Sequence, residues 1–148
     1  MLTETLKKLF NRDLSKLKSE IEAYQNEENI WRISHGIANS AGNLCLHLVG
    51  NLNTYIGATL GGTDYVRNRD LEFSLKDLPK QELISMIEAT ITVVSKTLDR
   101  VSQAQMDYEY PTKVLEEKTS TEFFLVHLST HLTYHLGQIN YHRRLLDR

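Results

Sequence analysis

The chain has 148 residues, 41% of them hydrophobic and 24% charged, which is enough to bury a core without disulfide bonds. Its formal net charge of −2 excludes a general electrostatic attraction to nucleic acid or to an anionic membrane. The single cysteine, Cys45, excludes an internal disulfide and a zinc site built from several cysteines.

No apolar run approaches the roughly 18 residues that predict a membrane helix. The first 13 residues alternate charged and apolar side chains, unlike the apolar core of a signal peptide. We therefore expect a cytoplasmic protein, and with no internal repeat or low-complexity tract we expect residues 1–148 to form a single domain.

An amphipathic helix is predicted over Leu2–Tyr24. Its apolar residues alternate in steps of three and four, as one buried helical face requires. They are Leu6, Phe10, Leu14, Leu17, Ile21 and Tyr24. The polar run 25–29 ends this helix, and residues 30–33 are expected to pack as a connector over one end of the helices.

A second helix is predicted from Ser34 or His35 to Leu60. Its expected buried stripe is Ile37, Ala41, Leu44, Leu48, Leu52 and Ile56. Glycine costs about 1 kcal/mol relative to alanine inside a helix, and asparagine is a poor helix former. This helix would nevertheless contain Gly36, Gly42, Gly50 and Gly57 together with Asn39, Asn43, Asn51 and Asn53. So many weak helix formers indicate the close approach of another backbone or space for a ligand.

The segment 63–78 shows no helical stripe and is expected to be a functional connection or a crossover along the helices. Arg67 and Arg69 are interrupted by Asp64 and Asp70, so we interpret this cluster as a solvated face.

A third helix is expected to begin near Pro79 and to serve as scaffold. Its apolar stripe is Leu83, Ile87, Ile91, Val94, Leu98 and Val101. The segment 106–118 is predicted to be a second crossover with a short extended piece at 108–110. Thr119 and Glu122 have the spacing of a capping box, which predicts the start of a fourth helix. Four helices with long connections indicate an all-α four-helix bundle.

Four of the six histidines fall in this last helix. Residues four apart share one helical face, so His131 and His135 can direct their imidazoles to one divalent metal ion such as zinc. His127 and His135 are about 12 Å apart along the axis, so both cannot bind the same ion. The third ligand should come from another helix, and His47, between two core positions, is the best candidate. We interpret His35 and His142 as surface or packing residues.

Other chemistries find less support in the sequence. Cys45 is rotated by about 200° from His47 on a helix, so we expect a small buried hydrophobic residue there. No histidine has an acidic residue three positions before it, as ferritin-like di-iron sites require, and the HExxH motif is absent. Ser129 lacks both a glycine elbow and an acidic partner at a recognisable spacing.

Three stretches resemble the DinB-like superfamily of small four-helix proteins, which includes the bacillithiol and mycothiol transferase-like proteins. They are NSAGNLCLHLVGNL at 39–52, GGTDYVRNRDLEF at 61–73 and HLTYHLGQINYHRRLL at 131–146. The resemblance covers essentially the whole chain and points to a branch without an assigned activity.

This resemblance implies an up-down-down-up topology of the helices and a metal site formed by His47, His131 and His135. It also implies that the metal is nickel or zinc and that the protein is a homodimer.

We therefore expect a metal-dependent enzyme, thiol S-transferase-like or hydrolase-like, acting on a small thiol or another small molecule. Three imidazoles leave an open coordination position, which is typical of catalytic sites. Asn51 and Gln138 are expected to orient water or substrate, Tyr55 to line the pocket, and His127 to act as a proton shuttle or a packing residue. The alternative is a noncatalytic bundle that binds a ligand or protein and holds a structural or adventitious metal. No nucleic-acid or membrane partner is expected.

Overall fold

The computed structural model describes residues 1–34 and 36–148, and the regular elements of this part of the chain are all helices. Within those residues the only strand-like pairing is an isolated antiparallel bridge between Glu109 and Ser120, so the all-α prediction is confirmed. The long helices are α1 (Leu2–Ala23), α2 (Ala41–Leu52), α4 (Lys80–Leu98) and α6 (Thr121–Leu146). The short elements are the 3-10 helix η1 (Glu27–Trp31), the π-helix η2 (Asn53–Ala58), α3 (Arg69–Ser74) and α5 (Gln103–Asp107).

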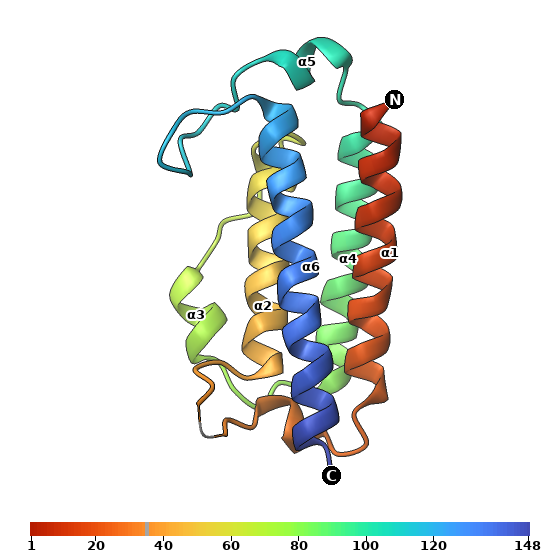
Figure 1. Cartoon of the computed structure of the whole chain (residues 1–148), viewed down its shortest axis with the longest axis vertical. Helices are drawn as coiled ribbons and strands as arrows, with labels where there is room; N and C mark the ends of the chain where they lie inside the picture. The colour runs from red at the N-terminus through yellow and green to blue at the C-terminus, as the bar shows by residue number, and fades with distance from the viewer. Residues whose placement is uncertain (35) are drawn as a thin grey trace.

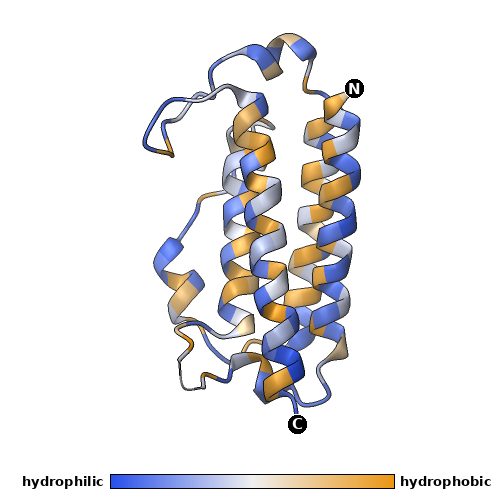
Figure 2. Cartoon of the chain, in the orientation of Figure 1, coloured by the Kyte–Doolittle hydropathy of each residue, from blue (hydrophilic) through white to orange (hydrophobic). Residues whose placement is uncertain are grey.

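The four long helices lie side by side around a common core (Figure 1). α1 packs against α4 and α6, and α2 packs against the same two helices. Hydrophobic and hydrophilic residues alternate along every long helix (Figure 2), as expected for elements with one buried face. In α1 the predicted stripe is buried throughout, with Phe10, Leu14 and Leu17 fully enclosed.

The second helix begins later than the sequence predicts. α2 starts at Ala41, where the Ser40 hydroxyl accepts a hydrogen bond from the backbone N–H of Asn43 at 3.1 Å. Gly36 has φ +86°, which no right-handed helix contains, and Ile37, expected in the buried stripe, is 41% exposed. The predicted start at Ser34 or His35 was therefore wrong, and His35 itself lies outside the described residues. At its other end α2 continues directly into η2.

The connection between α2 and α4 contains a helix that the sequence did not predict. Asn68 caps α3 by accepting a hydrogen bond from the backbone N–H of Leu71. The Asn43 side chain of α2 donates to the backbone oxygens of Glu72 and Leu75, at 3.0 and 2.8 Å. These bonds hold α3 against α2, beside the bundle (Figure 1).

The second long connection passes over one end of the helices and carries α5 (Figure 1). The extended piece expected at 108–110 is present as the bridge at Glu109. α6 is capped by Ser120 rather than by Thr119, because the Ser120 hydroxyl accepts from the backbone N–H of Phe123. α4 begins directly after Pro79, as predicted.

No helix in the described part of the chain combines the length and hydropathy that a bilayer crossing requires.

Candidate metal centre

Three histidines from two helices converge at one point between α2 and α6. His47 lies on α2, and His131 and His135 lie one turn apart on α6. One ligand nitrogen from each of the three rings lies within 4.8 Å of the other two. The ring centroids are 5.1 Å apart for His47 and His131, 5.3 Å for His47 and His135, and 4.6 Å for His131 and His135. The structure thus brings together the three residues expected to bind metal.

The spacing of the ligand atoms suits a small divalent ion. The Nε2 atoms of His47 and His131 are 3.3 Å apart. Two nitrogens bound to one tetrahedral zinc at about 2.0 to 2.1 Å lie about 3.3 Å from each other. The donor set of three imidazoles suits zinc and nickel, so these residues fit such an ion.

Hydrogen bonds to the far side of two rings select the tautomer that metal binding needs. His47 Nδ1–H donates to Glu72 Oε1 at 3.1 Å, and His135 Nδ1–H donates to Gln138 Oε1 at 2.7 Å. Each bond leaves the lone pair on Nε2, the atom that faces the centre for His47. Gln138, expected to orient water or substrate, has its side-chain oxygen on His135.

Glu72 is itself held by Arg67. The Arg67 guanidinium donates to both carboxylate oxygens, at 2.8 and 3.0 Å, and the two side chains are only 14% and 6% exposed. Burial lowers the pKa of Arg67, but its hydrogen bonds to Glu72 outweigh that effect and raise the pKa above its ordinary value. Interpreting Arg67 as part of a solvated face was therefore wrong.

Neither Glu72 nor Arg67 was identified from the sequence. The one signal was Gly50, which lies one turn after His47 on α2. A Cβ at Gly50 would overlap the carboxylate of Glu72, so glycine leaves the space that this side chain occupies. Space beside His47 was expected, but it holds a side chain from α3.

The surroundings of His47 and His131 lower the pKa values of these two imidazoles. Burial and the neighbouring histidines lower the pKa of His131 to about 4. Burial also lowers the pKa of His47, although Glu72 acts in the opposite direction. A neutral imidazole keeps the lone pair that a metal ion needs, so the lowered pKa values of His47 and His131 favour their ligating form at neutral pH. His131 Nδ1 is buried without a hydrogen-bond partner among the described residues.

A small polar pocket of about 240 Å³ adjoins His47 and His131. Asn51, Tyr55 and His127, the expected pocket residues, all line it. Asn51 is 7% exposed, and its Oδ1 atom has no hydrogen-bond partner within the described chain. The His127 ring stacks on Phe124 at 5.8 Å and lies 6.4 Å from the ring of His131, which places it beside the cluster but outside the ligand group. The remaining lining residues are Arg67, Arg69, Val114, Phe124 and Leu128.

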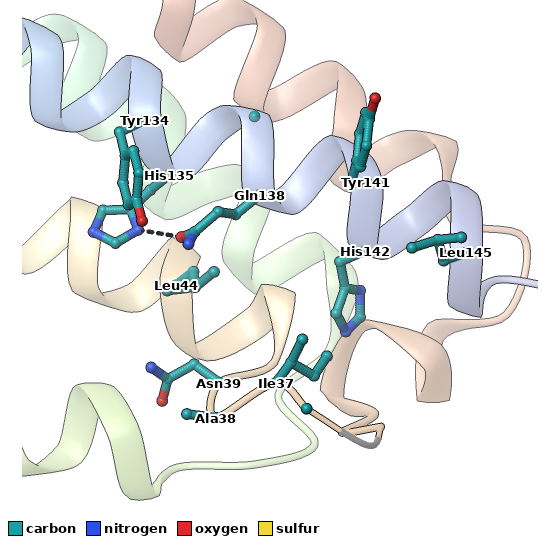
Figure 3. A pocket seen from close by; sticks show the side chains of 12 residues that line it. Ile37, Ala38, Asn39, Leu44, Tyr134, His135, Gln138, Tyr141, His142 and Leu145 are labelled. Carbon is teal, nitrogen blue, oxygen red and sulfur yellow. Dashed lines mark hydrogen bonds between the residues drawn. The ribbon is translucent and has the colours of Figure 1, made fainter.

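A larger groove of about 680 Å³ lies on the other side of the cluster, between α6 and the segment 36–39 (Figure 3). His135 and its hydrogen bond to Gln138 lie at one end of the groove, and Leu145 lies toward the other (Figure 3). Ile37, Leu44 and the tyrosines of α6 make its wall largely apolar. The histidine cluster therefore has a polar pocket on one side and an apolar groove on the other.

Two other candidates have structural roles. His142 Nδ1 accepts from the Tyr24 hydroxyl at 2.6 Å, and its Nε2–H donates to the backbone oxygen of Arg32 at 2.8 Å, which confirms a packing role. Cys45 is fully buried, and burial raises the pKa of its thiol to about 12, as expected for a buried hydrophobic residue.

Comparison with known proteins gives a family but no named relative. The model of the family described as "Protein of unknown function (DUF1572)" matches residues 2–148. No curated protein matches the chain.

Proposed function

The chain belongs to the DUF1572 family, and from this premise we propose that it is a metal-dependent enzyme in which His47, His131 and His135 hold one divalent cation, nickel or zinc. The observation that carries the proposal is the convergence of three imidazoles from two helices, with ligand atoms within 4.8 Å of one another. Three protein ligands leave a coordination position for a substrate, which distinguishes catalytic from closed structural sites.

The DinB-like resemblance supports the same proposal. Within that superfamily we assign the chain an up-down-down-up bundle topology, supported by the opposite directions of α1 and α2 in Figure 1 and by the long connection from α2 to α4. Homodimer formation, a cytoplasmic location and a small-molecule substrate such as a thiol belong to the proposal as well.

A divalent ion bound here would supply Lewis acidity, which polarises a carbonyl group or acidifies a water or thiol. This chemistry serves either a thiol S-transferase-like or a hydrolase-like reaction. The chain's own residues have separate tasks. Glu72 and Gln138 fix the tautomers of His47 and His135, and the polar pocket admits the reacting group beside His47 and His131.

One observation favours the noncatalytic alternative. The Nε2 atoms of His47 and His131 are close enough to share a hydrogen bond when no ion is bound. The cluster would then be a polar feature of the interface between α2 and α6, in a protein that binds a ligand or partner elsewhere. The two functions differ in whether the cluster takes up a metal and leaves a position open.

Metal titration of chelator-treated protein tests the proposal. We expect one nickel, zinc or cobalt ion per chain by calorimetry and elemental analysis. His131→Gln should weaken binding at least about 100-fold because it removes one of three ligands. His127→Gln is the matched control, since this histidine lies one turn away on the same helix but outside the ligand group. Metal content that stays at background after incubation would refute the proposal.

The open position has its own test. Cobalt(II) in the site gives a visible spectrum that depends on its ligands. Adding 2-mercaptoethanol, a small neutral thiol, should change that spectrum if a position is free. A spectrum that does not respond would favour the noncatalytic alternative.

A further inference from the structure

The two hollows beside the histidine cluster differ in charge. The polar pocket is lined by two guanidinium groups, those of Arg67 and Arg69, and by no carboxylate. The apolar groove has no arginine, lysine, aspartate or glutamate among its described lining residues. We propose that the polar pocket is a subsite for an anionic group of the substrate, a carboxylate or a phosphate-type group, and that Arg69 binds it. This subsite proposal rests on the proposed function only in assuming that the substrate reacts at the metal beside the pocket.

The two arginines are not equivalent. Arg67 is committed to Glu72 through two hydrogen bonds. Arg69 lines the same pocket, and within the described residues it makes no ion pair and no side-chain hydrogen bond. A guanidinium presents several N–H donors in a planar fork that matches a carboxylate or phosphate. Arg69 is therefore the cation available to a ligand, while Arg67 holds the Glu72 carboxylate that bonds His47.

Asn51 gives a second, independent indication of a ligand. Its side chain is buried on the pocket wall, one turn after His47, yet its Oδ1 atom has no partner within the described chain. Buried polar atoms nearly always find a hydrogen-bond partner. The same amide carries an NH₂ group, a donor of the kind that an anionic group accepts, so Asn51 can support Arg69 at the pocket wall.

The charge balance of the site favours an anion. The Arg67 and Glu72 charges cancel, so a divalent ion and Arg69 would add uncompensated positive charge around one pocket. A cleft lined by one sign of charge concentrates ligands of the opposite sign. The pocket volume of about 240 Å³ lies below the roughly 300–1,000 Å³ typical of drug-sized ligands, so the group it holds is small.

The test uses the full chain loaded with cobalt(II) and three probes: acetate, methylphosphonate and neutral acetamide. Paramagnetic relaxation of the probe nuclei by NMR reports both affinity and proximity to the cation. We expect an anion, but not acetamide, to bind near the cobalt. Arg69→Gln should weaken this binding at least about tenfold through loss of a charged hydrogen bond, and Arg69→Lys should recover part of it. The matched control is Arg100→Gln, an exposed arginine at the end of α4.

Each outcome decides a separate question. Arg69-dependent binding of acetate alone identifies a carboxylate substrate, and of methylphosphonate alone a phosphate-type one; either supports the subsite. Anion binding that is equal in the wild type and Arg69→Gln overturns it, as does equal binding of acetamide. If the protein takes up no cobalt, the proposed metal function fails. The subsite is then tested by amide chemical shifts of the metal-free protein with the same probes and variants, where loss of the Arg69 dependence overturns it.

Discussion

Glu72, on the segment between α2 and α4, contacts the histidine cluster through a single hydrogen bond from His47. A carboxylate on the far nitrogen of a ligand histidine fixes the orientation of the ring and increases the basicity of the nitrogen that faces the metal. Arg67 in turn fixes the buried carboxylate in place through two hydrogen bonds. The affinity of the proposed metal site would therefore depend on residues outside the ligand group.

We predict that Glu72→Gln lowers the affinity for zinc or cobalt by about 10- to 100-fold, because the amide keeps the shape of the side chain but loses its charge. Competition with a chromophoric chelator measures the change. The stoichiometry should remain one ion per chain, since all three ligands are still present. Glu117→Gln, at an exposed position, is the control and should bind as the wild type does. Equal affinities of the two variants would show that Glu72 has no positioning role.

At the scale of elements, the sequence of α2 is explained by the elements that pack against it rather than by helix propensity. The Asn43 side chain donates hydrogen bonds to the backbone oxygens of Glu72 and Leu75, and Gly50 leaves room for the Glu72 carboxylate. Of the weak helix formers of α2, Asn43 and Gly50 are the positions at which α3 is attached, whereas Gly42 leaves room for the ring of Trp31. The connection 63–78 is thus part of the candidate site, because it supplies both Arg67 and Glu72.

Two glycine substitutions separate this effect from helix propensity. In Gly50→Ala the new methyl group overlaps Glu72, which is held by Arg67 and His47, so we predict a loss of about 1–3 kcal/mol in the free energy of unfolding and weaker metal binding. In Gly137→Ala nothing lies within 4 Å of the new Cβ, so we predict a gain of about 0.5–1 kcal/mol in the free energy of unfolding and an unchanged metal affinity. Urea unfolding and metal competition measure both. A stabilising Gly50→Ala would contradict the packing of α3 described above.

At the scale of the whole molecule, three buried histidines make the stability of the metal-free protein depend on pH. Burial lowers the pKa of His47, His131 and His142 below 6.5, that of His131 to about 4. Below pH 6.5 the unfolded chain therefore takes up protons that the folded chain does not. The stability present above pH 6.5 should be lost progressively as the pH falls toward these lower values.

We predict a lower urea midpoint at pH 5.0 than at pH 7.5 for protein kept metal-free with chelator. In His131→Gln the difference between the two midpoints should shrink, because one of the three groups no longer titrates. A midpoint that rises on acidification would contradict the lowered pKa values.

Metal binding should act on the whole fold as well. An ion that binds only the folded chain adds about 4 kcal/mol to its stability at 1,000 times the dissociation constant. We predict that zinc raises the melting temperature of the wild type and of His127→Gln but not that of His131→Gln. Calorimetry measures the shift, and an equal increase in all three proteins would place the ion elsewhere.

Much of the arrangement follows from local sequence. Helix periodicity predicted α1 and α4 closely, because one buried face leaves a regular stripe of apolar residues. The i, i+4 spacing placed His131 and His135 together, since one turn of helix fixes their separation whatever surrounds them. The start of α2 was wrong because an apolar pattern does not show where a glycine takes a positive φ, as Gly36 does.

The sequence by itself determined α1, α4 and the histidine pair on α6, because these depend on interactions within a few residues. Only the tertiary structure decided that His47 meets this pair and that Glu72, held by Arg67, bonds the far nitrogen of His47. It also decided that a charged pocket and an apolar groove lie on opposite sides of the cluster. His47 lies 25 positions from Glu72 and 84 and 88 positions from His131 and His135, and no local pattern specifies these contacts. They exist because α3 is held against α2, and α2 against α6, by packing and hydrogen bonds across the fold.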